Sequence, residues 1–355
     1  MAKITLQDLR HSYRGNPQND DDWALKRLTL EWQDGGAYAL LGPSGCGKTT
    51  LLNIISGLIR PSEGRILFDG VDVTDATPER RNIAQVFQFP VVYDTLTVYD
   101  NLAFPLRNRG VGEVEVDRIV RQIAAMLDLQ STLTQRASGL SADGKQKISL
   151  GRGLVRSDVN VIMFDEPLTV IDPHLKWQLR SKLKELHHRI GRTMIYVTHD
   201  QTEALTFADE VVVMKDGMVV QTGTPVDLFE RPRHIFVGHF IGSPGMNVLR
   251  CEVKGGRAFV AGQPVESANA ARYRGAGTGL QLGVRPEFVT FAPDGIAVDV
   301  VKVADAGRHR IVETRLGDEI VNMLQPEDEA VPQGRVHLRF DPAHTQVYQD
   351  GWIVG

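Results

Sequence analysis

The chain has 355 residues, of which 42% are hydrophobic and 24% are charged, and it carries a formal net charge of −4. This length is typical of a globular protein with two domains, and the slightly acidic balance gives no overall attraction to nucleic acid. The longest apolar stretch, LLNIISGLI, is interrupted by Asn53, Ser56 and Gly57 and is shorter than the ~20 residues that a membrane-spanning helix needs. We therefore expect a soluble protein with no nucleic-acid partner, which associates with a membrane only peripherally.

The two cysteines, Cys46 and Cys251, lie far apart in the sequence and match no metal-ligand spacing. The N-terminal segment also lacks the basic and then apolar layout of a signal peptide. The cysteine pattern indicates a reducing compartment in which the two thiols are free.

Short apolar runs alternate with segments at helical spacing as far as residue 235, which predicts an α/β domain with a mainly parallel sheet. Three of these runs, AYALLG, NVIMFD and TMIYVTHD, read as buried strands that end in polar residues, where open α/β sheets bind their ligands. In VVVMKDGMVVQ, Asp216 and Gly217 predict a hairpin with a type I′ turn. Residues 236–355 contain short alternating runs separated by Gly, Pro and Asp, which predicts a small all-β barrel or sandwich.

The segment LLGPSGCGKTT lies between a predicted strand and a predicted helix that begins at Leu51. It fits the phosphate-loop pattern G-x-x-x-x-G-K-[ST], in which glycines let successive backbone N–H groups point at phosphate oxygens. Lys48 is expected to reach the β- and γ-phosphates, and Thr49 to bind Mg²⁺. A purely structural glycine turn is the alternative, but it leaves the lysine and the threonines without a role. The predicted nucleotide-binding residues are Gly42, Pro43, Ser44, Gly45, Cys46, Gly47, Lys48, Thr49 and Thr50.

The acidic pair Asp165 and Glu166 follows the strand NVIMFD and supplies the second half of such a site. Asp165 is expected to hold Mg²⁺ and its water shell, and Glu166 to polarise the attacking water. His199, at the end of TMIYVTHD, is placed to contact the γ-phosphate and orient that water, while Gln88 is a candidate contact to Mg²⁺ and the water from a loop. Each has an ordinary alternative, namely a solvated helix start, a structural histidine or an exposed glutamine, and the neighbouring phosphate loop favours the functional interpretation.

With these motifs in this order, the chain resembles the nucleotide-binding subunits of ABC transporters, and more narrowly those of carbohydrate and polyol importers. The resemblance extends over nearly the whole chain. It implies a P-loop ABC ATPase domain in residues 1–235 and a small oligomer-binding-type β domain, for regulation or dimerisation, in residues 236–355.

The resemblance also gives family roles to single residues. Residues 42–49 match the Walker A motif, Gln88 the Q-loop, Asp165 and Glu166 the Walker B pair, Asp172 the D-loop and His199 the switch histidine. Tyr13 falls where the family stacks an aromatic ring on adenine, with simple packing as the alternative.

The family's signature is L-S-G-G-Q, and alignment through LGRGLVR places Leu140, Ser141, Ala142, Asp143 and Gly144 on its five positions. Both glycines are replaced. In the family two subunits pair head to tail, so the resemblance implies that Ser141 and Asp143 face the ATP that the partner binds. A carboxylate ~4 Å from a phosphate costs roughly 1–4 kcal/mol per charge pair, which predicts a weak site. The alternative is that Asp143 caps its own helix.

We therefore expect a heterodimer with a second, non-identical ATPase subunit that carries an intact signature. The favoured function is an ATP-hydrolysing subunit that energises import of a small polyol, for which the resemblance to bacterial glycerol importers indicates glycerol. The alternatives are a sugar or glycerol-phosphate importer and a mainly structural or regulatory ATP-binding subunit. A soluble ABC-type ATPase of DNA repair or translation would carry a coiled-coil insertion or a second cassette, and neither is visible in the sequence.

ATP and Mg²⁺ are the expected cofactors. Membrane-spanning permease subunits are the expected partners, docked on the apolar segment that contains Phe89, Val91, Val92 and Tyr93. A substrate-binding protein is an indirect partner. The expected location is the cytoplasmic face of the bacterial inner membrane, as a peripheral subunit.

Overall fold

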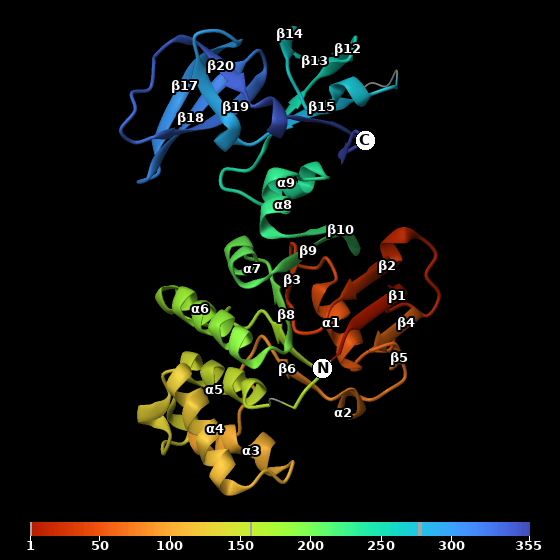
Figure 1. The fold of residues 1–355 in the computed structure, drawn as a ribbon, viewed down its shortest axis with the longest axis vertical. Coiled ribbons are helices and arrows are strands. Elements are labelled where there is room, and N and C mark those ends of the chain that lie inside the picture. The colour runs from red at the N-terminus through yellow and green to blue at the C-terminus, as the bar shows by residue number, and fades with distance from the viewer. Residues whose placement is uncertain (1, 157, 276–278) are drawn as a thin grey trace. The chain divides into compact units, whose positions relative to one another are not determined.

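The computed structural model describes residues 2–156, 158–275 and 279–355 (Figure 1). The chain divides into two compact units, Met1–Pro225 and Val226–Gly355. The first unit mixes helices with strands, and the second is mainly β-structure, so the predicted α/β plus all-β fold class is confirmed. None of the helices in the described part of the chain is long and apolar enough to cross a lipid bilayer.

The first unit alternates strands with helices. Its strands are β1 (Ile4–His11), β2 (Leu25–Trp32), β3 (Ala37–Leu41), β4 (Glu63–Phe68), β5 (Val71–Asp72), β6 (Ile83–Val86), β7 (Val161–Asp165), β8 (Thr193–Thr198), β9 (Glu210–Lys215) and β10 (Met218–Gly223). Its helices are α1 (Lys48–Ser56), α2 (Pro78–Arg81), α3 (Val98–Arg107), α4 (Glu113–Met126), α5 (Ala142–Leu154), α6 (Pro173–Ile190) and α7 (Gln201–Phe207).

A mainly parallel sheet carries the predicted site. Within the described residues its strand order is β10-β9-β3-β8-β7-β6, and every neighbouring pair except β10 and β9 is parallel. The runs AYALLG, NVIMFD and TMIYVTHD form β3, β7 and β8, and all residues of these strands are buried. Leu41 pairs with Thr198 and Asp165 pairs with Val197, so the carboxyl ends of the three strands meet at one edge.

A second, antiparallel sheet of order β2-β1-β4-β5 supports the first through a shared core. Leu6 and Trp32 of this sheet lie in one buried cluster with Leu51 and Ile55 of α1 and Met163 of β7. One hydrophobic core therefore joins both sheets and the helix that follows the phosphate loop. That helix begins at Lys48 and not at Leu51, because Gly47 already forms its N-cap.

The tight turn between β9 and β10 is the one that the sequence predicts. Asp216 and Gly217 both have positive φ, at 49° and 76°. A type I′ turn requires positive φ at both central residues, which glycine and aspartate adopt more easily than other residues. Lys215 lies opposite Met218 in the antiparallel pair, so the hairpin is confirmed.

The second unit contains three antiparallel sheets in the part of the chain that the structure describes, with orders β11-β15-β21-β22, β12-β13-β14 and β16-β20-β17-β18-β19. Leu282, Val298, Val312, Leu338 and Val347 belong to the core that these sheets share. The strands are β11 (Asn247–Arg250), β12 (Glu252–Lys254), β13 (Arg257–Val260), β14 (Gln263–Val265), β15 (Leu280–Val284), β16 (Val289–Ala292), β17 (Ile296–Asp305), β18 (His309–Leu316), β19 (Glu319–Pro326), β20 (Arg335–Phe340), β21 (Gln346–Gln349) and β22 (Trp352–Ile353).

Two short helices, α8 (Pro225–Glu230) and α9 (Ile235–Phe240), precede these strands. The division between the units falls after Pro225, before the boundary at residue 235 that the sequence suggests. The physical reason is Arg285, a buried side chain whose guanidinium donates to the carbonyls of Phe229 in α8 and of Gly238 in α9. Because these bonds tie both helices to the β-sheets, the helices belong with the second unit.

Candidate active site

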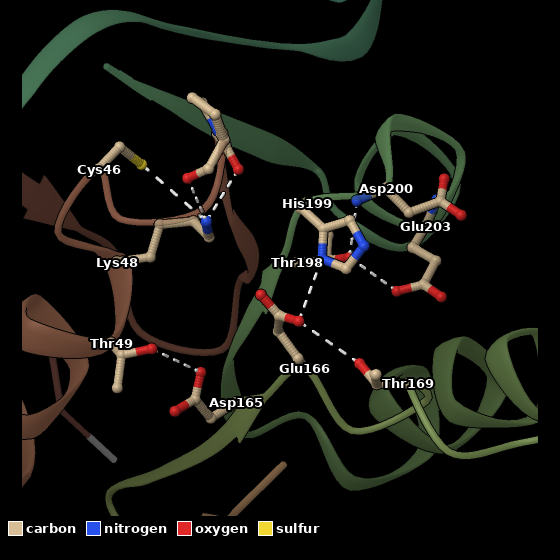
Figure 2. Close-up of polar contacts among 12 residues, drawn as sticks. Cys46, Lys48, Thr49, Asp165, Glu166, Thr169, Thr198, His199, Asp200 and Glu203 are labelled. Carbon is tan, nitrogen blue, oxygen red and sulfur yellow. Dashed lines mark hydrogen bonds and ion pairs between the residues drawn. The ribbon is translucent and has the colours of Figure 1, made fainter. Parts of the chain in front are cut away.

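The phosphate loop runs from the end of β3 to the start of α1. Gly47 has φ +99°, and a Cβ at this position would lie 2.7 Å from the carbonyl oxygen of Ala24, so both the backbone and the space require glycine. The Lys48 side chain is buried, and its Nζ donates to the carbonyl oxygens of Gly42 at 2.8 Å and Pro43 at 2.9 Å (Figure 2). The ammonium therefore lies inside the loop, where the α1 N-terminus adds a positive partial charge.

Cys46 lies in the same loop, with its Sγ 3.9 Å from the Lys48 Nζ. Burial raises the pKa of the Cys46 thiol, and the nearby Lys48 charge opposes this effect only in part. The thiol is therefore neutral at physiological pH and leaves the positive charge of Lys48 available to an anion. Ser44 and Gly45 are exposed at the tip of the loop, and Pro43 is half-buried.

Thr49 and Asp165 bring two oxygen atoms together from α1 and β7. The Thr49 hydroxyl donates to Asp165 Oδ1 at 3.2 Å. Burial raises the pKa of Asp165, the Thr49 hydrogen bond lowers it, and the charge of Glu166 raises it further. A buried carboxylate beside a hydroxyl fits Mg²⁺, which binds one or two protein oxygens and takes its other ligands from water and phosphate.

Glu166 is held in an unusual backbone conformation, with φ of 45°. Its N–H donates to the carbonyl oxygen of Val197 in β8, and its Oε2 lies 3.0 Å from His199 Nδ1. The Thr169 hydroxyl reaches the same Oε2 at 3.4 Å (Figure 2). Side chains in sparsely populated backbone conformations gather at functional sites, and here the strain aims the carboxylate at His199.

Tyr13 is tied to the helix that follows the phosphate loop. Its hydroxyl lies 3.1 Å from Thr50 Oγ1, and its ring contacts the buried His11 ring edge-on with 4.8 Å between the ring centroids. The Tyr13 side chain is 66% exposed, so most of its aromatic surface is open to a ligand.

Gln88 is half-buried in a bend that follows β6. Within the described residues it makes no hydrogen bond to Thr49 or Asp165, so the structure does not join it to the other predicted metal ligands. The bend borders a cavity of about 310 Å³ that Gln85, Phe87, Val91, Phe104 and Arg152 help to line. Phe89 and Tyr93 are exposed beside it, at 70% and 42%, and Val92 is half-buried.

Ser141, and not Asp143, caps α5. Its Oγ accepts from the Gly144 N–H at 3.2 Å, because Ser141 has the extended backbone that an N-cap requires. Asp143 lies in the first turn, and its Oδ2 is 3.4 Å from Lys147 Nζ, one turn further on. Its other oxygen, Oδ1, is buried and has no hydrogen-bond partner among the described residues. The alternative that Asp143 caps its own helix is therefore wrong.

Asp172, assigned to the D-loop, is the N-cap of α6 and accepts from the His174 N–H at 2.9 Å. Thr169 is a site residue that sequence reasoning missed. Its contact with Glu166 depends on the turn between β7 and α6, and a threonine in a loop carries no pattern that would have indicated it.

A phosphate loop, a Thr49–Asp165 oxygen pair and a Glu166–His199 pair at one edge of a parallel sheet define a P-loop nucleotide hydrolase. The profile of the ABC transporter family matches residues 25–169. The sn-glycerol-3-phosphate import ATP-binding protein UgpC of Jannaschia sp. (strain CCS1) is 36% identical over 350 residues, which cover 98% of each chain. The chain belongs to the ABC transporter family and is an ABC-type ATPase.

Further relatives and solved structures agree with this assignment. UgpC of Paracoccus denitrificans is 37% identical over 98% of this chain and 97% of its own length, and UgpC of Salmonella typhimurium is 39% identical over 99% and 98%. Among solved structures, cbiO1 from Clostridium perfringens, part of the ABC transporter complex cbiONQ, has a TM-score of 0.58 at 28% identity and covers 64% of this chain and 90% of its own. The ATP-binding cassette MJ0796, in a post-hydrolysis dimer bound to ADP and phosphate, has a TM-score of 0.56 at 27% identity. The match covers 62% of this chain and 98% of the MJ0796 chain.

Proposed function

We propose that this protein is the ATPase subunit of an importer for glycerol phosphate or a sugar. The observation that carries this proposal is the near-full-length match to glycerol-3-phosphate import ATP-binding proteins, which includes the second unit as well as the ATPase unit. None of the names of these relatives mentions free glycerol. The glycerol-phosphate alternative from the sequence is therefore better supported than the glycerol interpretation.

In this function the residues of the phosphate loop hold ATP. Lys48 and the backbone N–H groups of residues 44–49 bind the phosphates, and Tyr13 presents its ring to adenine. Thr49 and Asp165 would hold Mg²⁺, which would neutralise charge on the phosphate oxygens. Gln88 would contact the metal and the attacking water from its loop.

Glu166 accepts a proton from the attacking water. His199 holds the Glu166 carboxylate through the 3.0 Å contact and contributes a second polar group beside the γ-phosphate. To test the catalytic assignment, Glu166→Gln is compared with the wild type. Turnover is expected to fall ~10²–10⁴-fold while ATP binding persists, and unchanged turnover would show that another group is the base.

Membrane-spanning permease subunits are the proposed partners, and a substrate-binding protein acts through them. The cavity beside Gln88 and the exposed rings of Phe89 and Tyr93 provide an apolar surface next to the site. A permease segment docked there would sense the position of Gln88. The protein would then work as a peripheral subunit at the cytoplasmic face of the bacterial inner membrane.

Asp143 supports a second, non-identical ATPase subunit as the pairing partner. If two subunits pair so that α5 of one faces the ATP of the other, the carboxylate of Asp143 opposes phosphate, and Lys147 offsets only part of its charge. A partner with an intact signature would complete the site that contains Lys48 and Glu166. Inactivating this chain by Glu166→Gln should then cost more turnover than the matching change in the partner. Purification as a homodimer that hydrolyses ATP briskly would contradict the idea.

The cargo is tested by uptake. Cells lacking this protein are complemented with the wild type or with Glu166→Gln, and import of labelled glycerol 3-phosphate, glycerol and a disaccharide is measured. Glycerol 3-phosphate import restored only by the wild type supports the proposal. If the wild type restored only glycerol import, the transported molecule would be glycerol and the glycerol-phosphate proposal would be wrong.

A further inference from the structure

A buried carboxylate, Glu203, lies behind the loop that carries His199. Glu203 is on α7 and is only 4% exposed. Its Oε2 accepts from the Thr198 hydroxyl at 2.8 Å and from the Tyr196 hydroxyl at 3.2 Å (Figure 2 shows Thr198 and Glu203). The function described above assigns no role to this carboxylate.

The direction of these hydrogen bonds follows from the groups present. An ionised carboxylate only accepts, so the Thr198 hydrogen points at Glu203 and its oxygen lone pairs remain for the Asp200 N–H, which donates to it at 3.0 Å. Burial raises the pKa of Tyr196 well above its ordinary value, so that its hydroxyl stays protonated and also donates. Glu203 thus fixes the orientation of the Thr198 hydroxyl.

The result is a turn that is held on both sides of His199. Thr198 precedes His199 and is bonded to Glu203, while the Asp200 side chain caps α7 by accepting from the Thr202 N–H at 2.7 Å. His199 itself has a side chain that is 53% exposed and points toward Glu166. The histidine therefore relies on the backbone on either side of it for its position.

Glu203 also faces the helix that starts at the D-loop. Its Oε1 lies 4.0 Å from the Nζ of Lys176, in the first turns of α6, whose N-cap is Asp172. Burying a carboxylate costs free energy unless the group is paired, and Glu203 is paired with two hydroxyls and lies near Lys176. The carboxylate therefore orders the groups around it, among them the hydroxyl of the residue that precedes His199.

We propose that Glu203 is a positioning residue for ATP hydrolysis, which holds His199 against the Glu166 carboxylate by orienting the Thr198 hydroxyl. This inference rests on the proposed catalytic roles of His199 and Glu166. Glu203 itself stays behind the turn and acts on the reaction only through it.

The experiment measures kcat and KM for ATP in the full chain purified with its membrane subunits. Thr198→Val keeps the shape of the side chain and removes the hydroxyl, Glu203→Ala removes the acceptor, and Glu203→Gln keeps one acceptor oxygen. Thr206→Val is the matched control, because Thr206 is exposed on the same helix and its hydroxyl bonds to carbonyls of that helix. Thr198→Val and Glu203→Ala are expected to lower kcat ~10–100-fold while KM stays unchanged. Glu203→Gln and Thr206→Val are expected to keep most of the wild-type kcat.

The same changes are repeated in a His199→Ala background. If Glu203 acts through His199, Thr198→Val causes no further loss of turnover there. Equal losses in both backgrounds, or a kcat that Thr198→Val leaves unchanged, overturn the inference. If His199→Ala alone leaves turnover intact, the proposed role of His199 fails instead. Should Glu203→Ala fail to fold, as judged by its melting curve, Thr198→Val decides the question because it leaves the packing in place.

Discussion

The hydroxyl of Thr49 lies 3.2 Å from the carboxylate of Asp165, although 116 residues separate them in the chain. The contact exists because β3 leads into α1 through the phosphate loop while β7 ends at the same edge of the sheet. Thr49 and Asp165 would hold a metal ion from two segments that the sheet and the shared hydrophobic core bring together. Burying the Asp165 carboxylate is unfavourable in free energy, and the protein needs this burial to form the site before a metal ion binds.

Asp165→Asn is expected to stabilise the protein in the absence of nucleotide and to inactivate it. Burial raises the pKa of Asp165 above its unfolded value, so the folded state favours the protonated form and the ionised form, present at neutral pH, opposes folding. The stabilising contribution of the protonated Asp165 carboxyl is complete at pH values below the pKa of the unfolded state. It is lost as the pH rises through the pKa of the folded state. We expect a gain of roughly 0.5–2 kcal/mol in the free energy of unfolding at pH 7, and a loss of ~10²-fold or more in Mg²⁺-dependent hydrolysis.

Chemical denaturation and ATPase assays check both halves of this prediction. Thr49→Val is the companion variant, since it also removes a metal ligand but leaves the buried charge in place. A lower free energy of unfolding for Asp165→Asn than for the wild type at pH 7 would contradict the argument.

Gly47→Ala is expected to destroy nucleotide binding. The change forces a Cβ into a residue with φ +99° and to within 2.7 Å of the Ala24 carbonyl oxygen, which costs roughly 1–3 kcal/mol and displaces the loop. Gly15→Ala is the matched control, because a Cβ there meets nothing within 4 Å. Calorimetric titration with ATP compares the two, and equal affinities would mean that the loop tolerates a side chain.

Arg285→Met is expected to destabilise the second unit by roughly 2–5 kcal/mol. The substitution keeps an apolar side chain but removes the donors to Phe229, Gly238 and Ile241, whose carbonyls are then left without this partner. Arg250→Met serves as the control, since the Arg250 side chain is 94% exposed and ion pairs at the surface contribute little. Limited proteolysis between residues 223 and 246 should accelerate for Arg285→Met alone.

The second unit should lose stability in alkaline solution partly through Cys251. Burial raises the pKa of this thiol from 9.0 to about 11. The protonated thiol is therefore favoured by folding, and its contribution is complete below pH 9 and lost as the pH rises through about 11. The free energy of unfolding is measured with urea, in the presence of a reductant, at pH 8 and at pH 10.5. The decrease between the two pH values should be smaller by roughly 1–2 kcal/mol in Cys251→Ala than in the wild type. Equal decreases in the two proteins would refute this role of Cys251.

Some features of the site were readable from the sequence because they are local. The glycines and Lys48 of the phosphate loop, the strands that end at Asp165 and Thr198, and the Asp216-Gly217 turn all depend on neighbours within a few residues. The contact between Thr169 and Glu166 and the network around Glu203 were not readable, because each depends on which side chains a turn or a helix presents to another element. Which residue caps α5 was not readable for a similar reason, since it depends on the extended backbone that Ser141 adopts in the folded chain.

The sequence by itself determined the fold class, the phosphate loop, the acidic pair and the family, because each is recorded in the order and spacing of residue types along the chain. The tertiary structure alone decided that Thr49 meets Asp165, that Glu166 is aimed at His199 from a strained backbone, and that α8 and α9 belong with the second unit. Hydrogen bonds and buried charges between distant segments depend on distances and angles between elements, and packing of the whole core fixes these.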